Sequence, residues 1–181
     1  KENNIAILLC AGKSKRVNDF DKSIINLKNK PIFFYSIEKF LYSKKIKKIV
    51  IVASKENNGF IKNYLSDLNL KNIEVILGST ERKYSVKKAL TYISKYSPEN
   101  VIIHDSARPY FNKEIILNGL KFLDNYSCVI PIVKIVDTVK KINSDKFLST
   151  IERDDLYYSQ TPQFFNYDHL KNLVLEQIDN K

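Results

Sequence analysis

The stretch "ILLCAGKSKR", residues 7–16, indicates the class of fold. Its apolar run ends abruptly at Gly12, and a short loop with three cationic side chains follows (Lys13, Lys15 and Arg16). Small residues at the exit of a buried strand let backbone N–H groups approach a ligand closely, and such groups together with cations suit phosphates. The stretch therefore predicts a phosphate-binding loop after a first strand, although an ordinary turn gives the same pattern.

Two common nucleotide-binding motifs do not fit this loop. It lacks the Gly-Lys-Ser/Thr ending of a Walker loop, and Ser14 stands where a dinucleotide fingerprint needs its second glycine. The rest of the sequence therefore has to identify the ligand.

Apolar runs of two kinds alternate along the chain. Short, unbroken runs are typical of parallel strands buried on both faces, and they occupy Ile5–Cys10, Ile49–Ala53, Ile73–Leu77, Val101–His104 and Val129–Val133. Longer runs with helical spacing lie between them, at Ile32–Tyr42, Phe60–Leu68, Val86–Tyr96 and Ile115–Leu123. The alternation predicts an α/β fold with a doubly wound, mostly parallel, Rossmann-like sheet in a single domain over residues 1–181.

The pattern changes after Val133. The segment "KIVDTVKKINSDKFLSTIER", residues 134–153, has two β-prone runs around a turn signal at residues 143–145 and fewer apolar residues. It predicts a β-hairpin arm over about residues 134–155 that projects from the sheet. Because an isolated two-stranded hairpin is only marginally stable in water, we expect the arm to pack against a second copy of the chain. A final helix is predicted over Tyr167–Ile178.

Composition argues against several classes of protein. Of the 181 residues 28% are charged, and no apolar stretch approaches the roughly 20 residues that span a bilayer. No signal peptide is visible, so we expect a cytoplasmic protein with no membrane contact. Cys10 and Cys128 lie in apolar runs without metal-ligand spacing, and we expect both to be reduced and buried. The net charge of +10 comes from lysines spread over the whole chain, which favours an anionic small molecule over nucleic acid as the partner.

Two more polar loops follow predicted strands and are expected at the same edge of the sheet. "HDSARP", residues 104–109, places Asp105 and Arg108 three residues apart, although the pair could simply cap the next helix. "STERKYSV", residues 79–86, lies between a strand and a helix, and Ser85 could simply be the N-cap of that helix. Ligands of such sheets bind at the carboxyl ends of the strands, so the three loops predict a single site.

These loops carry a resemblance to a known family. The pieces "LLCAGKSKR", "DKSI", "ERKYSV", "HDSARP", "VDTVKK", "IERDDLY" and "TPQFF" occur in one order. From about Ile5 to Phe165 the chain resembles the 2-C-methyl-D-erythritol 4-phosphate cytidylyltransferases of the non-mevalonate isoprenoid pathway. The fourth and last pieces are shared with the sister ribitol-5-phosphate cytidylyltransferases, and the first loop with sugar nucleotidyltransferases in general.

The resemblance implies a nucleotidyltransferase fold and a reaction. CTP and methylerythritol phosphate would give the cytidine diphosphate derivative and pyrophosphate, with Mg²⁺ bound mainly through the CTP phosphates. Arg16 and Lys22 would stabilise the transition state as fixed cations, and Asp105 would help to position the metal. The nucleotide would be held by Cys10, Ala11, Gly12, Ser79, Thr80, Ser85, Asp105 and Ser106.

Four residues resemble those that hold the acceptor phosphate, namely Arg108, Thr138, Arg153 and Thr161. Thr138 and Arg153 lie on the two sides of the predicted hairpin. In this family the arm reaches across to a partner, so the resemblance implies a homodimer in which these two side chains complete the neighbour's site.

The sequence also departs from the family pattern. Asp21 stands where a proline usually precedes the lysine, Cys10 replaces an alanine, and Ser79-Thr80 replaces a common Gly-Asp pair. The family chain continues well past Ile178 to a final lysine in a context that this sequence does not contain. Three explanations are expected: the chain is truncated, it stops early, or it is part of a fusion with the cyclodiphosphate synthase of the same pathway. Two alternatives stay open: an enzyme acting on ribitol 5-phosphate, and a catalytically impaired nucleotide-binding module.

Overall fold

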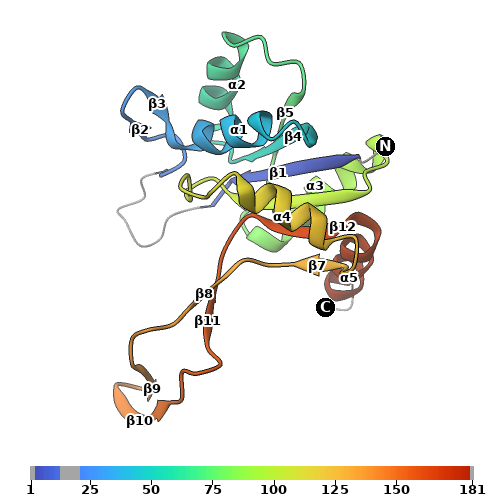
Figure 1. Cartoon of the computed structure of the whole chain (residues 1–181). Coiled ribbons are helices and arrows are strands. Elements are labelled where there is room, and N and C mark those ends of the chain that lie inside the picture. Colours follow the sequence, from blue (N-terminus) through green and yellow to red (C-terminus); the bar gives the residue numbers. More distant parts are fainter. Residues whose placement is uncertain (1–2, 13–20, 180–181) are drawn as a thin grey trace.

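A six-stranded sheet with helices on both faces forms the body of the protein (Figure 1). The computed structural model describes residues 3–12 and 21–179. The strand order is β5-β4-β1-β6-β12-β7, with β1 at Asn4–Cys10, β4 at Ile46–Ala53, β5 at Ile73–Leu77, β6 at Asn100–Asp105, β7 at Cys128–Val129 and β12 at Gln163–Asn166. Strands β5, β4, β1 and β6 are parallel, whereas β12 runs antiparallel to both of its neighbours. The predicted doubly wound, mostly parallel α/β sheet is confirmed.

Two apolar clusters, one on each face, hold the helices to the sheet. One face is covered by α1 (Ile32–Tyr42), α2 (Asn58–Ser66) and α4 (Glu114–Phe122), whose side chains pack on Ala6, Leu8 and Cys10 of β1. The other face is covered by α3 (Arg82–Ile93) and α5 (Tyr167–Asp179), which pack on Ile5, Ile7 and Leu9. Every residue of β1 is buried, because alternate side chains enter opposite clusters. This burial fixes the end of β1, from which the first loop leaves.

A ribbon of short strands extends from the body (Figure 1). Its base pairs β8 (Ile132–Lys134) with β11 (Tyr157–Ser159), and its tip pairs β9 (Val139–Asn143) with β10 (Lys146–Ile151), in both cases antiparallel. Ser144 and Asp145 have φ values of 45° and 66° at the turn, a conformation common to tight hairpins. The predicted hairpin is therefore present, and we call residues 132–159 the arm.

Remaining elements are short. Strands β2 (Asn26–Leu27) and β3 (Lys30–Pro31) form a small hairpin before α1, and a 3₁₀ turn at Ser94–Tyr96 follows α3. Within the described residues, no helix has the length and apolar character needed to cross a bilayer.

Three details of the sequence interpretation were wrong. The run Val129–Val133 is not one strand: it divides between β7 and β8, with Pro131 between them. Cys128 is exposed rather than buried, because β7 is two residues long and is the last strand of the sheet, paired only with β12. Ser85 is not an N-cap, because α3 already begins at Arg82.

Candidate active site

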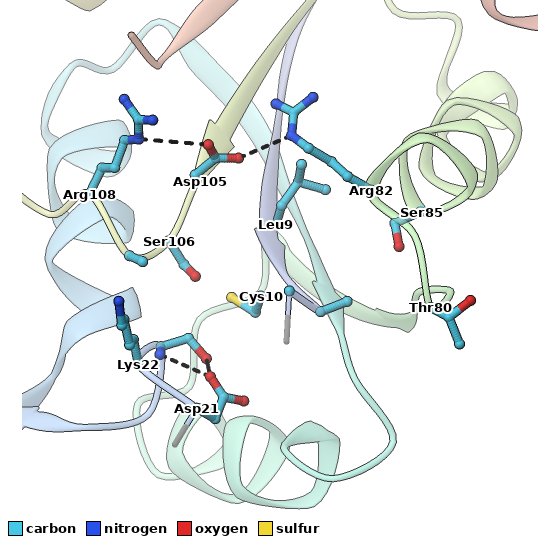
Figure 2. A pocket seen from close by; sticks show the side chains of 14 residues that line it. Leu9, Cys10, Asp21, Lys22, Thr80, Arg82, Ser85, Asp105, Ser106 and Arg108 are labelled. Carbon is cyan, nitrogen blue, oxygen red and sulfur yellow. Dashed lines mark hydrogen bonds and ion pairs between the residues drawn. The ribbon is translucent and has the colours of Figure 1, made fainter. Parts of the chain in front are cut away.

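A pocket of about 640 Å³ lies at the carboxyl ends of β1 and β6 (Figure 2). It is lined by residues from four segments of the chain: Leu9, Cys10, Ala11, Gly12, Asp21, Lys22, Ser23, Thr80, Arg82, Ser85, Asp105, Ser106, Ala107 and Arg108. The position agrees with the general rule that ligands of such sheets bind beyond the carboxyl ends of the strands.

The floor of the pocket is the end of β1. Ser106 donates its backbone N–H to the carbonyl of Leu9 at 3.1 Å, which joins the first loop to the loop after β6. Burial raises the pKa of the Cys10 thiol to about 12, and a hydrogen bond with Ser106 opposes this only in part. Cys10 is therefore an uncharged thiol and not a nucleophile.

Opposite charges converge on Asp105 at one side of the pocket. Its Oδ1 lies 3.4 Å from Nε of Arg82, and its Oδ2 lies 3.8 Å from Nε of Arg108 (Figure 2). Arg108 also donates from a guanidinium nitrogen to Oε1 of Gln160 at 2.8 Å. The three charged side chains are partly exposed, so these ion pairs contribute little to stability. Their effect is to hold two guanidinium groups beside the cavity.

His104, at the end of β6, holds the loop that follows this strand through buried hydrogen bonds. It is fully buried, with Nε2 at 3.1 Å from both Ser36 Oγ and the Arg108 carbonyl, and Nδ1 at 2.8 Å from Thr161 Oγ1. A carbonyl can only accept, so the network assigns the proton to Nε2 and makes Nδ1 the acceptor of the Thr161 hydroxyl. Burial lowers the pKa of His104 to about 3, against the hydrogen bond to the Arg108 carbonyl, and the nearby charges of Arg108 and Lys39 lower it further. The imidazole is therefore neutral.

Ser85 fixes the loop between β5 and α3. Its Oγ accepts the backbone N–H of Ser79 at 2.9 Å and donates to the Ser79 carbonyl at 3.2 Å. Gly78 is needed beside it, because a Cβ there would lie 2.8 Å from the Cβ of Ala11 and 2.9 Å from Ser85 Oγ. Thr80 lines the pocket, whereas Ser79 does not.

The structure brings together most of the predicted site residues. Nine of them line the pocket: Cys10, Ala11, Gly12, Lys22, Thr80, Ser85, Asp105, Ser106 and Arg108. Thr161 is buried behind the loop on His104, and Thr138 and Arg153 lie exposed on the arm, where Arg153 donates to the carbonyl of Val136. Arg16 lies outside the described residues.

Sequence interpretation missed several side chains at the pocket. Arg82 belongs to the piece "ERKYSV", but its contact with Asp105 joins positions 23 residues apart, and no local sequence pattern indicates it. Asp21 and Ser23 also line the cavity on either side of Lys22. Their positions depend on contacts with Asn57, which no motif contains.

The carboxylates at the pocket suit a metal ion that enters bound to a phosphate-bearing ligand. Asp105 and Asp21 line the cavity, and within residues 3–12 and 21–179 no group of three or more His, Cys, Asp or Glu side chains could enclose an ion. Mg²⁺ is commonly bound through one or two carboxylates plus substrate phosphates, so this donor set fits such an ion.

Comparisons with known proteins agree with the geometry. Residues 4–180 match the profile of the family described as 2-C-methyl-D-erythritol 4-phosphate cytidylyltransferase. The chain is 38% identical to the Clostridium novyi enzyme of that name, over 93% of this chain and 74% of the relative. It is 41% identical to the bifunctional enzyme IspD/IspF of Pelagibacter ubique, over 94% of this chain but only 45% of that protein.

The fold comparison gives the same family. The crystal structure of 4-diphosphocytidyl-2C-methyl-D-erythritol synthase from Anaerococcus prevotii superposes with a TM-score of 0.84 at 27% identity, covering 98% of this chain and 77% of that one. The fold, the pocket and the sequence matches lead to one conclusion: the chain belongs to the 2-C-methyl-D-erythritol 4-phosphate cytidylyltransferase family of nucleotidyltransferases.

Proposed function

We propose that the chain transfers the cytidylyl group of CTP to 2-C-methyl-D-erythritol 4-phosphate and releases pyrophosphate, as one nucleotidyltransferase domain that carries its pocket at the end of β1. The observation that supports this most directly is the lining of the pocket, where three family loops and Lys22 meet. The names of the curated relatives favour methylerythritol phosphate over ribitol phosphate as acceptor.

The proposed chemistry needs charge stabilisation more than proton transfer. A phosphate oxygen of the acceptor attacks the α-phosphorus of CTP and pyrophosphate leaves in line. The attacking group is already an anion, so no general base is required. The barrier lies in bringing two anions together and in the charge that grows on phosphorus, which fixed cations stabilise. Of the two cations that the family resemblance implies, Lys22 lines the pocket, with Arg82 and Arg108 across from it (Figure 2). Arg16 is proposed as a further cation from its motif alone.

Mg²⁺ is proposed as the cofactor, held mainly by the CTP phosphates with Asp105 as the protein ligand. When bound, it would neutralise phosphate charge. Asp105 is held in place for this role by its two arginine partners.

The nucleotide is proposed to lie over the end of β1, against Cys10, Ala11 and Gly12. Thr80, Ser85, Asp105 and Ser106 line the same cavity, and Ser79 is tied to it through Ser85. Backbone groups of the first loop and of the Ser79–Thr80 turn would read the cytosine edge, while Asp105 and Ser106 would face the ribose.

We expect a strong preference for CTP over UTP. Uracil carries an acceptor where cytosine carries an amino donor, so buried acceptors that pair with cytosine would be left unsatisfied, at about 1–3 kcal/mol each. For one such group this corresponds to roughly a 5- to 150-fold lower kcat/KM with UTP. Pyrophosphate release measured with each nucleotide and a saturating acceptor tests the expectation. Comparable turnover with both would point to a broader nucleotidyltransferase.

A homodimer formed through the arm is proposed to complete the acceptor site. The arm presents exposed apolar side chains at Val136, Ile142, Phe147 and Leu148, with 74%, 61%, 62% and 52% of their surface accessible. Thr138 and Arg153 are not among the residues lining this chain's pocket. An arm seated on a second copy would cover its apolar side chains and supply Thr138 and Arg153 to the other subunit, beside the Arg108 and Thr161 of that subunit.

Subunit mixing tests the arm. The variants Lys22→Ala and Arg153→Ala are each expected to have strongly reduced activity, and their mixture should regain activity after subunits exchange. In a mixed dimer one site carries both defects and the other carries neither, provided that Arg153 acts in trans. Mass spectrometry of the intact dimer checks exchange. Confirmed exchange without recovery would show that Arg153 serves its own subunit or no site.

A further inference from the structure

A buried polar cluster stands beside the pocket, and the proposed reaction does not use it. At its centre is Asn57, which follows β4, immediately precedes α2 and is fully inaccessible to solvent. Its amide nitrogen donates to the carbonyl of Cys10 at 2.8 Å and to Oδ2 of Asp21 at 2.5 Å, with Ser23 Oγ farther away at 3.3 Å. A buried polar side chain with satisfied hydrogen bonds adds rigidity to the segments that it joins.

The carboxylate of Asp21 is engaged through both of its oxygens. Oδ1 accepts the backbone N–H of Ser23 at 2.9 Å and its hydroxyl at 2.5 Å, while Oδ2 accepts from Asn57. Although Asp21 lines the pocket, these three hydrogen bonds direct its oxygens toward the protein. Figure 2 shows the carboxylate beside Lys22 at the end of the pocket away from Asp105.

Asn57 connects this carboxylate to the rigid part of the fold. Its Oδ1 accepts the backbone N–H of Ser54 at 2.8 Å, just after β4, and its amide group reaches the last residue of β1. Both strands lie inside the sheet, and the ends of both at this edge are buried. The residues on either side of Lys22 are thus fastened to the ends of two sheet strands.

We propose that Asp21 and Asn57 form a clamp that positions Lys22 for transition-state stabilisation, an inference that rests on the proposed function. They are positioning residues, because the hydrogen bonds described for them go to the protein. A lysine has a long, flexible side chain, so fixing the backbone on both sides of it narrows the positions that its ammonium group can reach. A displacement of about 1 Å in such a group can lower a rate by about 10²-fold.

The isosteric variant Asp21→Asn tests the clamp. It keeps an acceptor for Ser23 but turns an amide NH₂ toward the NH₂ of Asn57, so the pair loses its hydrogen bond. We expect kcat to fall about 10²-fold while the KM for CTP stays within a few-fold of the parent. In a Lys22→Ala background the same change should lower kcat no further, because the positioned group is gone. Asp67→Asn, at the exposed C-terminal end of α2, is the matched control and should keep parental kinetics.

Two kinetic results would overturn the proposal. An equal fold-loss from Asp21→Asn with and without Lys22 would show that Asp21 acts independently of the lysine. Recovery of the single variant at high Mg²⁺ concentration would make Asp21 a metal ligand instead.

A measurement without substrate separates this proposal from the proposed function. Urea unfolding of Asp21→Asn, Asn57→Ala and the double variant should show losses of unfolding free energy that are strongly non-additive. The reason is that each single change already breaks the hydrogen bond between Asn57 and Asp21. Additive losses of unfolding free energy would contradict the proposed clamp even if the parent enzyme is fully active. A parent that transfers no cytidylyl group to either polyol phosphate would refute the proposed function, whatever the unfolding cycle shows.

Discussion

Replacing Lys22 with alanine is expected to lower the rate of cytidylyl transfer about 10²–10³-fold while CTP affinity changes only a few-fold. The reason is that Lys22 lines the pocket beside the end of β1, on the side opposite Asp105 and its two arginines (Figure 2). A fixed cation there acts on charge that develops only during transfer, so its loss lowers kcat more than it weakens binding. Single-turnover rates together with CTP binding measured by calorimetry separate the two effects.

A matched control removes a lysine elsewhere. Lys47 is exposed on β4 and is not among the lining residues, so Lys47→Ala changes the net charge equally and should leave the rate unchanged. Arg16→Ala is expected to behave like Lys22→Ala, on the strength of its motif. If CTP affinity collapses in Lys22→Ala while the single-turnover rate at saturation persists, the lysine binds the ground state and its proposed role is wrong.

The strands at the centre of the sheet could be predicted because β1, β6 and the second half of β4 have side chains buried on both faces. Val50 and Val52 on β4 enter one cluster while Ile49 and Ile51 enter the other, so residues 49–53 of this strand form an unbroken apolar run. The start of α3 could not be located in the same way. Its first turn, Arg82–Ser85, is polar, and what fixes it is the contact of Ser85 with the Ser79 backbone.

The loops of the site could be predicted from topology, and their cross-contacts could not. Once β1 and β6 are parallel neighbours, Cys10 and Asp105 must lie at one edge of the sheet. The hydrogen bond from Asn57 to Asp21 spans 36 positions, and although Asp21 begins the piece "DKSI", Asn57 belongs to no motif. In the arm, the turn at 143–145 predicts the tip, whereas the pairing of Ile132 with Ser159 at its base joins two three-residue strands with no composition signal.

Acidification from pH 7 to pH 5 is expected to lower the free energy of unfolding by about 2 kcal/mol through His104 alone. The folded-state pKa of His104 is about 3, lowered by burial from the usual histidine value of 6.5. Between these two values the unfolded chain binds a proton that the native chain does not, so stability is retained above pH 6.5 and is lost as the pH falls. A second proton would enter at Nδ1, break the hydrogen bond donated by Thr161, and place a buried charge near Lys39 and Arg108.

Carboxylates contribute in a separate window. Partial burial opposes ionisation of Glu74, but hydrogen bonds from Lys48, Tyr96 and Tyr92 hold its pKa at about 2. The stability that Glu74 supplies is therefore present above about pH 4.5 and is lost as the pH falls further. Measurements between pH 7 and pH 5 isolate the histidine from this carboxylate.

Urea unfolding at several pH values checks the His104 prediction. His104→Asn should be less stable than the parent at pH 7, because it leaves space among Phe40 and Phe111, but its stability should vary little down to pH 5. His169→Gln, on exposed α5 surface, removes the other histidine and should keep the parental slope. In the parent, the ring proton signals of His104 should not shift over this range. A parent whose stability is flat from pH 7 to pH 5, or whose His104 signals titrate there, would show that the ring accepts its proton inside the fold and that the neutral bridge between Thr161 and the Arg108 carbonyl is not required.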